Sequence, residues 1–569
     1  MFEISKRDGL ARLGKIKTAH GILETPTLLP VVNPKILTLS MEELQECGAQ
    51  GLITNSYIIY KNSELKKIAE EKGVHGLLNW DGPIMTDSGT FQSHVYGEIE
   101  MEPDVILDFQ KKIGVDIGTV LDVFTEPGTR FEEAKKELNE TQKRIENADK
   151  NKENMMLAAP VQGGRHLDLR AKASSGASKT TAELFPIGGV VPFMEQNKFK
   201  QLAEIVLACK KELDISRPVH LFGCGHPMLF GLAVFMGCDV FDSASYAKFA
   251  SRDSLMFTWG TRKLEELETF PNEFSASPDI SITQLKSMEK EKRQKIIAKH
   301  NLIVSFAEIR RVKQAIHEGT LWELVENRLR TSPALMKVFD VLKDDWLSKF
   351  EPTYRYKTPL KTGKESDNRP IFANFKEFDK GEMMHPYFGK VPLHLSETYP
   401  FHPGLLQDDM EGWKMQEWDV ARVCTILDYQ FGKGIGKAFT NGDVELITSR
   451  KTKRLRNLVL DGKHLASLSH RRGLFILQEQ GARLIHKNSK STQFRVVIDP
   501  ETASFNRDGK SVFCKFIKDI DSNLRCMDEC IVVTPKDELV AFGKLIVSPE
   551  EIGLGQQGMA IRVRSGIPE

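Results

Sequence analysis

The sequence predicts an α/β protein in which a (β/α)8 barrel comes first and smaller domains follow. Three observations support this fold class. The chain has 569 residues, too many for one ordinary domain. Over roughly the first 330 residues, short apolar runs alternate with charged stretches of helical spacing, which favours a parallel sheet. Beyond a proline-rich segment, the pattern changes to short β-like runs separated by Asp, Asn and Gly turns.

Strand-like runs divide the first part of the chain into repeating units. They are TPTLLPVV, GLITNSY, PIMTDSG, IGTVLD, MMLAAPVQGG, LFPIGGVVP, PVHLFGCG and CDVFDSAS. Eight such units predict a closed barrel, and a doubly wound open sheet is the alternative. In a barrel, the carboxyl ends of the strands surround the active site. Asp87, Asp122, Gln162 and Asp242 hold such positions, so we expect them to converge at one barrel mouth.

The later segments predict further domains. Helical spacing after the last barrel strand completes a barrel domain with a helical extension, residues 1–335. Seven prolines in the 52 residues from Pro352 to Pro403 mark a boundary or an extended connector, within a small domain of residues 336–415. The β-like runs that follow form a basic α+β domain, residues 416–492, and a last domain, residues 493–569.

Composition narrows the class of protein. With 40% hydrophobic and 28% charged residues the chain is typical of soluble globular proteins, and no stretch is apolar enough for a membrane span or a signal peptide. Eight irregularly spaced cysteines argue against a disulfide framework, so we expect a cytoplasmic protein. The net charge is only +1, but Arg450 to Arg495 contains twelve Lys or Arg and two acidic residues. This segment predicts a surface for a polyanion, or else a plain solvated basic face.

The stretch TDSGTFQ carries the sharpest chemical signal. Asp87 is a candidate acid or base if burial raises its pKa. Gly89 allows close approach of a ligand to the backbone, and Phe91 offers a flat face for a planar ring. A structural alternative is equally open, because Asp87 or Ser88 could instead cap a following helix.

Other strand ends suit a flat polar heterocycle. GCDVFDSAS contains two acids, Asp239 and Asp242, and one of them could be a nucleophile at the barrel mouth. Gln162 can both donate to and accept from the edge of a base. The glycine pairs in VQGG and IGGVVP allow close approach beside apolar walls, although a single pair is a weak signal.

These motifs together resemble those of archaeal tRNA-guanine transglycosylases, also described as 7-cyano-7-deazaguanine tRNA-ribosyltransferases. The resemblance runs over nearly the whole chain and is carried by TDSGTFQ, LDVFT, VQGG, IGGVVP, LFGCGHP, GCDVFDSA, FGKGIG and KTKRLRN. The segment from about Gln493 to Glu569 is similar to a PUA RNA-binding domain. The implied fold is therefore a TIM barrel with small C-terminal domains that include a PUA-like one.

The resemblance implies a reaction and roles for these residues. The enzyme would exchange guanine at position 15 of the tRNA D-loop for preQ0 (7-cyano-7-deazaguanine), on the route to archaeosine, without a cofactor. Asp242 would be the nucleophile that forms a covalent bond to the ribose, and Asp87 the general acid and base. The implied base-pocket positions are Phe91, Asp122, Gln162, Gly189, Val190 and Val191.

A tRNA substrate also explains the basic segment. Extracting a base from its stack costs a few kcal/mol, and cationic contacts with phosphates can offset this cost. The candidate RNA-binding residues are Arg450, Lys451, Lys453, Arg454, Arg456, Arg471 and Arg472.

The sequence departs from the family at its zinc site. Family members bind zinc after the last barrel strand, through three cysteines and a histidine. Here Asn272, Phe274 and Ser277 stand about where the cysteines would be, and only His300 remains. Structural zinc needs four good ligands, so we expect no zinc, with packing around Pro271 and Phe274 in its place. The implied homodimer is then less certain if zinc braces the dimer surface.

Two other functions fit the same domains. One is an archaeosine-synthase-like paralogue, which acts on preQ0 already in tRNA and is not expected to keep the exchange pocket. The other is a non-catalytic tRNA-binding subunit, which the missing cysteines would favour. The presence of both Asp87 and Asp242 argues against each of them.

Overall fold

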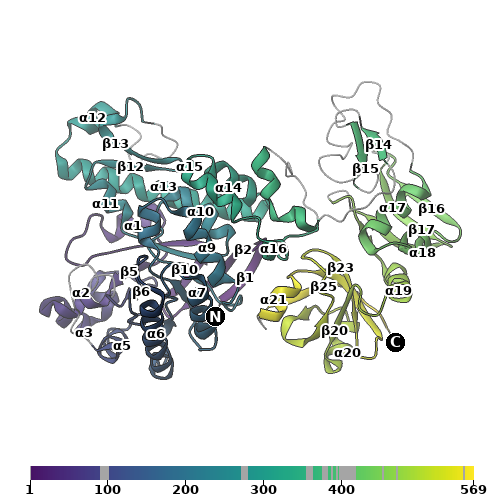
Figure 1. The fold of residues 1–569 in the computed structure, drawn as a ribbon, viewed down its shortest axis with the longest axis horizontal. Helices are drawn as coiled ribbons and strands as arrows, with labels where there is room; N and C mark the ends of the chain where they lie inside the picture. Colours follow the sequence, from purple (N-terminus) through teal and green to yellow (C-terminus); the bar gives the residue numbers. More distant parts are fainter. Residues whose placement is uncertain are drawn as a thin grey trace. The chain divides into compact units, whose positions relative to one another are not determined.

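The chain forms two compact units, Met1–Val341 and Leu342–Glu569 (Figure 1). The computed structural model describes residues 2–89, 102–270, 280–353, 363–374, 382–385, 389–392, 395, 418–451, 454–469, 472–554 and 558–568. Among these residues, no helix combines the length and the apolar character needed to cross a bilayer.

The first unit contains a closed barrel of eight parallel strands. Two four-stranded sheets, β5-β6-β7-β8 and β9-β10-β11-β4, are joined by the parallel bridges Val31–Ile53 and Ala158–Leu184. The strands are β4 (Thr27–Pro30), β5 (Leu52–Asn55), β6 (Ile84–Asp87), β7 (Ile117–Thr119), β8 (Met156–Ala158), β9 (Phe185–Ile187), β10 (Val219–Leu221) and β11 (Val240–Ser243). The barrel prediction is confirmed, and the open-sheet alternative is wrong.

Helices connect successive strands and form the outer layer of the barrel (Figure 1). In the longest of the connecting helices, α6, the buried residues Ala134, Leu138, Ile145 and Ala148 recur at helical spacing, so one face packs inward. The helices are α1 (Met41–Cys47), α2 (Ser56–Lys61), α3 (Ser63–Leu78), α5 (Pro103–Lys112), α6 (Phe131–Asn151), α7 (Leu167–Ser178), α8 (Val191–Glu195), α9 (Phe199–Lys210), α10 (Pro227–Phe235) and α11 (Ser245–Ala250).

An antiparallel sheet that the sequence analysis did not predict precedes the barrel. Its strands are β1 (Phe2–Asp8), β2 (Ala11–Thr18) and β3 (Gly21–Thr25). Ile16 and Leu23 from this sheet share a hydrophobic cluster with barrel residues such as Ile117. Arg12 on β2 forms a buried ion pair with Asp239, just before β11 (2.7 Å). Asp239 therefore holds the N-terminal sheet to the barrel and is not part of the mouth.

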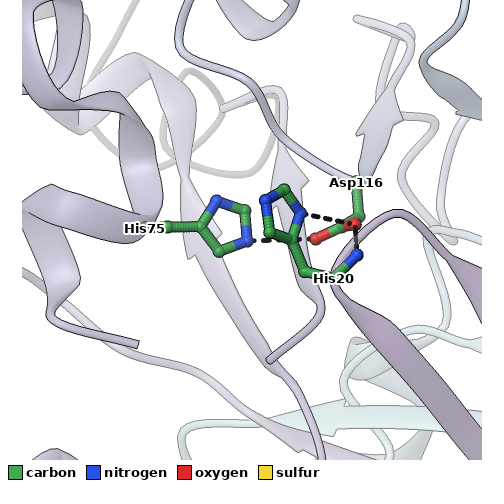
Figure 2. Close-up of side chains that lie close together, drawn as sticks. All are labelled: His20, His75 and Asp116. Atoms are coloured by element: carbon green, nitrogen blue, oxygen red, sulfur yellow. Dashed lines mark hydrogen bonds and ion pairs between the residues drawn. The ribbon is translucent and has the colours of Figure 1, made fainter. Parts of the chain in front are cut away.

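Two histidines and an aspartate make a second link between this sheet and the barrel (Figure 2). One Asp116 oxygen accepts hydrogen bonds from the amide and Nδ1 of His20 (both 3.0 Å), and the other accepts from His75 Nε2 (3.1 Å) and the Ile84 amide (2.9 Å). Burial of Asp116 opposes ionisation, but these hydrogen bonds outweigh it and lower its pKa. The two imidazole rings stack with centroids 3.7 Å apart. Because Asp116 comes just before β7, this cluster of His20, His75 and Asp116 lies at the amino ends of the strands, away from the mouth.

A helical extension completes the first unit, as the sequence predicts. The 29-residue helix α13 packs against α10, α11 and β12. The hairpin formed by β12 and β13 was not predicted. The elements are β12 (Ser254–Phe257), β13 (Gly260–Lys263), α12 (Ile282–Ser287), α13 (Lys290–Glu318), α14 (Leu321–Leu329) and α15 (Pro333–Met336).

The second unit begins with short elements and continues with two sheets. The first elements are α16 (Asp345–Ser348), β14 (Glu382–His385) and β15 (Gly389–Pro392). A four-stranded sheet and three helices follow: α17 (Val420–Phe431), α18 (Ile435–Phe439), β16 (Val444–Thr448), β17 (Leu455–Leu460), β18 (Lys463–Leu468), β19 (Phe475–Leu477) and α19 (Glu479–Asn488).

A six-stranded sheet ends the chain, in the order β21-β25-β24-β23-β20-β22. Its elements are β20 (Arg495–Ile498), α20 (Ala503–Arg507), β21 (Val512–Phe513), β22 (Ile517–Ile520), β23 (Glu529–Val533), β24 (Leu539–Leu545), α21 (Pro549–Leu554) and β25 (Met559–Gly566). One hydrophobic core includes Leu458 and Ile485 from the preceding part together with Ile531 and Phe542 from this sheet. The division of the chain into four domains stays a prediction.

Candidate active site

Three carboxylates gather at the mouth of the barrel. Asp87 is the last residue of β6, Asp242 lies on β11, and Asp122 follows β7. Burial, together with the negative charges of Asp122 and Asp242, raises the pKa of Asp87 to about 7, although the amide donors Gly89 and Ser88 act in the opposite direction. The structure therefore brings these three residues together, as expected, and gives Asp87 a pKa suited to moving protons near neutral pH.

Asn55 orients the Asp87 carboxylate from the neighbouring strand. The two residues are paired in the β5–β6 register. Asn55 Nδ2 donates to Asp87 Oδ2 (3.1 Å), while Asn55 Oδ1 accepts from the amide of Ile58 and so caps α2. The Gly89 amide donates to Asp87 Oδ1 (3.3 Å). Asn55 lies within the strand-like run GLITNSY, but only the pairing of β5 with β6 shows that it stands beside Asp87.

Among the described residues, two groups donate to Asp242, and both bind the same oxygen. His220 Nε2, from β10, lies 2.9 Å from Asp242 Oδ1, and the Gly223 amide lies 2.8 Å from the same atom. Gly223 has φ of +70°, and a Cβ there would lie 2.3 Å from Val191 Cγ2, so the turn needs glycine. The Asp242 side chain keeps 14% of its surface exposed and remains accessible to a substrate.

A polar wall for a base lies beside these acids. Gln162 Nε2 donates to Asp122 Oδ2, and among the described residues Gln162 Oε1 has no hydrogen-bond partner. A Cβ at Gly188 would lie 2.5 Å from Gln162 Nε2, which explains the glycine at this close approach. Gly189 also lies next to Gln162, and Val190 is fully buried beside it. Gln162 Oε1 is therefore available as an acceptor, and the backbone at Gly188 and Gly189 lies beside it, which suits the polar edge of a heterocycle.

Arg170 holds the two loops of this wall in place. Its fully buried guanidinium donates to three carbonyl oxygens, those of Val161 (2.7 Å), Gly164 (2.9 Å) and Gly188 (2.8 Å). Burial lowers its pKa. The sequence analysis did not identify Arg170, because an arginine within a helix, α7, gives no local signal of such a contact.

Two further pocket expectations have different outcomes. Val191 begins α8, and its Cγ2 faces Gly223 below Asp242. Phe91 lies outside the described residues, and so does any helix that Asp87 or Ser88 could cap, because residues 90–101 are not described. Stacking on Phe91 therefore stays a prediction.

The predicted RNA-binding cations differ in exposure. Arg450 and Lys451, between β16 and β17, and Arg456, on β17, are exposed, while Arg454 is half-buried. Arg472 donates to the carbonyl of Met527 (2.8 Å), and burial lowers its pKa, so it has a structural contact of its own. The other two candidates lie outside the described residues: Lys453 and Arg471.

His300, the remaining counterpart of the family's zinc ligands, lies in an apolar environment. Its ring packs edge-on against Phe257 and Phe270, and Nε2 faces the Met256 carbonyl (3.3 Å). Burial lowers its pKa to about 4. Among the described residues, no group of three metal-ligating side chains includes it, and the absence of zinc stays a prediction. The positions expected to replace the cysteines and pack in their place fall outside those residues: Pro271, Asn272, Phe274 and Ser277.

Three family models match separate parts of the chain. Residues 7–334 match the family model described as queuine tRNA-ribosyltransferase. Residues 421–491 match the patch-forming domain C2 of tRNA-guanine transglycosylase, and residues 494–567 match the PUA domain. The PUA-like prediction for the last segment is thus confirmed.

Full-length relatives agree with the family models. The chain is 42% identical to a tRNA-guanine(15) transglycosylase of Thermococcus kodakarensis, over 100% of this chain and 99% of the relative. It is 41% identical to the protein of that name from Pyrococcus furiosus, covering 98% of it, and 39% identical to that of Methanothermobacter thermautotrophicus, covering 99%. The chain therefore belongs to the tRNA-guanine transglycosylase family of tRNA-ribosyltransferases.

Proposed function

We propose that this enzyme exchanges guanine at position 15 of tRNA for preQ0 by double displacement at the ribose C1′. The observation that carries the proposal is the pair of carboxylates at the barrel mouth. Asp242 is partly exposed and held through one oxygen, and Asp87 has a pKa near 7. The position and the leaving base follow the printed name of the relatives, tRNA-guanine(15) transglycosylase. The incoming base, preQ0, follows from the sequence resemblance.

In the first step, Asp242 displaces guanine. A lone pair of the carboxylate forms the bond to C1′ as the C1′–N9 bond breaks, and the electrons of that bond go to the guanine. Protonated Asp87 supplies the proton that the leaving base needs. The product is a covalent ribosyl ester of Asp242, with the configuration at C1′ inverted.

In the second step, the incoming base reverses this sequence. Asp87, now ionised, takes a proton from the base, whose nitrogen attacks C1′ and releases Asp242. A second inversion restores the β-configuration. The enzyme ends with the proton distribution with which it began, so no cofactor or energy source is required.

The polar wall is suited to hold the base during the exchange. Gln162 Oε1 is an open acceptor, and Asp122 and the Gly189 backbone lie beside it. Because water would hydrolyse the ester, the pocket must exclude it while the bases exchange. The exposed cations Arg450, Lys451 and Arg456 are candidates for phosphate contacts in the second unit. We place the enzyme in the cytoplasm, where tRNA is modified and its thiols stay reduced.

The direct test is incorporation of labelled bases into unmodified tRNA by the purified enzyme. Labelled guanine and labelled preQ0 should both enter the tRNA, and changing guanine 15 to adenine in the transcript should abolish incorporation. Tight tRNA binding without incorporation of either base would favour a non-catalytic subunit. Conversion of tRNA that already contains preQ0, without base exchange, would favour an archaeosine-synthase-like enzyme.

We also propose that the enzyme functions without zinc at the family site. Elemental analysis of purified protein should find well below one zinc per chain, and chelator treatment should leave exchange activity and thermal stability unchanged. Stoichiometric zinc that disappears in His300→Gln would contradict this expectation. Zinc that survives in His300→Gln but disappears in His75→Gln would instead belong to the cluster of His20, His75 and Asp116.

A further inference from the structure

A buried histidine, His220, contacts the proposed nucleophile, Asp242. His220 has no exposed surface, and it sits on β10, which pairs in parallel with β11. Its Nε2 atom and the Gly223 amide both lie within hydrogen-bond distance of Asp242 Oδ1, at 2.9 and 2.8 Å. No local sequence motif predicts this contact, because the two side chains come from different strands.

The surroundings of the ring define its protonation. An ionised carboxylate can only accept, so Nε2 must be the protonated nitrogen of the pair. Among the described residues, Nδ1 has no hydrogen-bond partner, although it is buried. The ring therefore acts on Asp242 as a donor through Nε2–H. The edge of the ring packs against Phe222, with centroids 4.6 Å apart, and this contact fixes its orientation.

The geometry points to His220 as a positioning residue that fixes the plane of the Asp242 carboxylate, so that one oxygen is held by donors and the other is free to attack the ribose. Two fixed donors occupy Oδ1, whereas Oδ2 has no donor among the described residues. Turning the carboxylate out of this plane would break both hydrogen bonds, so the donors hold the plane of the group and leave the oxygen without a donor, here Oδ2, free to bond to C1′.

This role rests on the proposed function, because it requires Asp242 to be the nucleophile. It adds a consequence for the second step. When the incoming base attacks C1′, the ester bond to Oδ2 breaks and negative charge returns to the carboxylate. His220 and Gly223 already donate to Oδ1 at that moment, so they stabilise the leaving carboxylate without rearrangement.

The test compares His220→Leu with His220→Gln. The leucine fills much of the space but cannot donate, whereas the glutamine places an amide N–H about where Nε2 lies. We expect His220→Leu to slow formation of the covalent tRNA adduct in a single turnover about 10- to 100-fold. KM for tRNA and for the base should change less than about twofold, because His220 has no exposed surface and acts through Asp242. His220→Gln should recover the rate to within a few-fold of the wild type.

The pH profile separates positioning from a merely structural role. Loss of a donor to the carboxylate should move the acidic limb of the single-turnover rate to higher pH in His220→Leu and not in His220→Gln. The matched control is His300→Gln, which alters another buried histidine, far along the chain on α13. It should lower thermal stability without changing the rate or the pH profile.

Each other outcome has a distinct meaning. Wild-type rates and an unchanged profile in His220→Leu would overturn the positioning role, provided that the wild type exchanges bases and Asp242→Asn does not. Absence of exchange by the wild type would instead remove the proposed function. If His220→Leu does not fold, His220→Asn replaces it, since its shorter amide cannot reach Oδ1. Equal rates for the asparagine and glutamine variants would then refute the inference.

Discussion

Asp242→Asn is expected to lower base exchange by at least about 10⁴-fold, because an amide cannot form the ribosyl ester. The variant should fold normally. Its side-chain oxygen can still accept from His220 and from the Gly223 amide, so the local hydrogen bonds survive. No covalent adduct with tRNA should be seen on a denaturing gel, while tRNA binding measured by filter retention should stay close to that of the wild type. An adduct that persists in this variant would place the nucleophile elsewhere.

Asp239→Asn is the matched control for this substitution. Asp239 lies three positions earlier, just before the same strand, and its 1% exposed side chain pairs with Arg12. Weakening this buried pair should cost about 3 kcal/mol of the free energy of unfolding, measured by denaturant titration. The folded fraction should keep its adduct formation and its kcat. Loss of activity without loss of stability in Asp242→Asn, and the reverse in Asp239→Asn, would show that Asp242 acts in the reaction and that Asp239 attaches the N-terminal sheet.

Asp87→Asn is expected to lower the rate of exchange about 10³-fold, the usual scale for loss of a positioned acid and base. Asparagine keeps the size of the side chain, so binding of tRNA should change little. Asp81→Asn is the matched control, because Asp81 is an exposed aspartate on the turn that precedes β6. It should exchange bases at the wild-type rate. Exchange by Asp87→Asn within a few-fold of the wild type would exclude Asp87 as the proton donor.

The pH dependence should run in opposite directions for the two half-reactions. Burial and the neighbouring carboxylates raise the pKa of Asp87 to about 7, so the residue is protonated below this pH and ionised above it. The first step needs the acid form, so the rate of adduct formation should fall as pH rises above about 7. The second step needs the ionised form, so reaction of the isolated adduct with preQ0 should slow as pH falls below about 7. Both limbs should vanish in Asp87→Asn.

Much of the site follows from strand ends that can be read in the sequence. Parallel strands bring their carboxyl ends to one rim, whatever their separation along the chain. This rule alone placed Asp87, Asp122, Gln162 and Asp242 together, and the structure agrees for all four. The glycine pair in IGGVVP was a weaker signal, and the structure shows that a Cβ at Gly188 or Gly189 would crowd the Gln162 side chain.

The residues that support the site could not be read in this way. Arg170 contacts three carbonyls of two loops, and His220 contacts a carboxylate on the next strand. Such contacts depend on side-chain direction and on the register between strands, and neither is encoded in a local motif. The N-terminal sheet was not predicted for a related reason. Its strands are linked to the barrel only by tertiary contacts, such as the ion pair between Arg12 and Asp239.

The barrel and the rim on which the site lies could be predicted from apolar periodicity and strand-end residues, which are properties of local order along the chain, and the family from the resemblance of its motifs. The fold decided between Asp239 and Asp242. Three residues of strand span about 10 Å, so one aspartate reaches the Arg12 side of the barrel and the other reaches the mouth. It also decided the state of Asp87, because a raised pKa requires burial beside two other carboxylates that are distant in sequence.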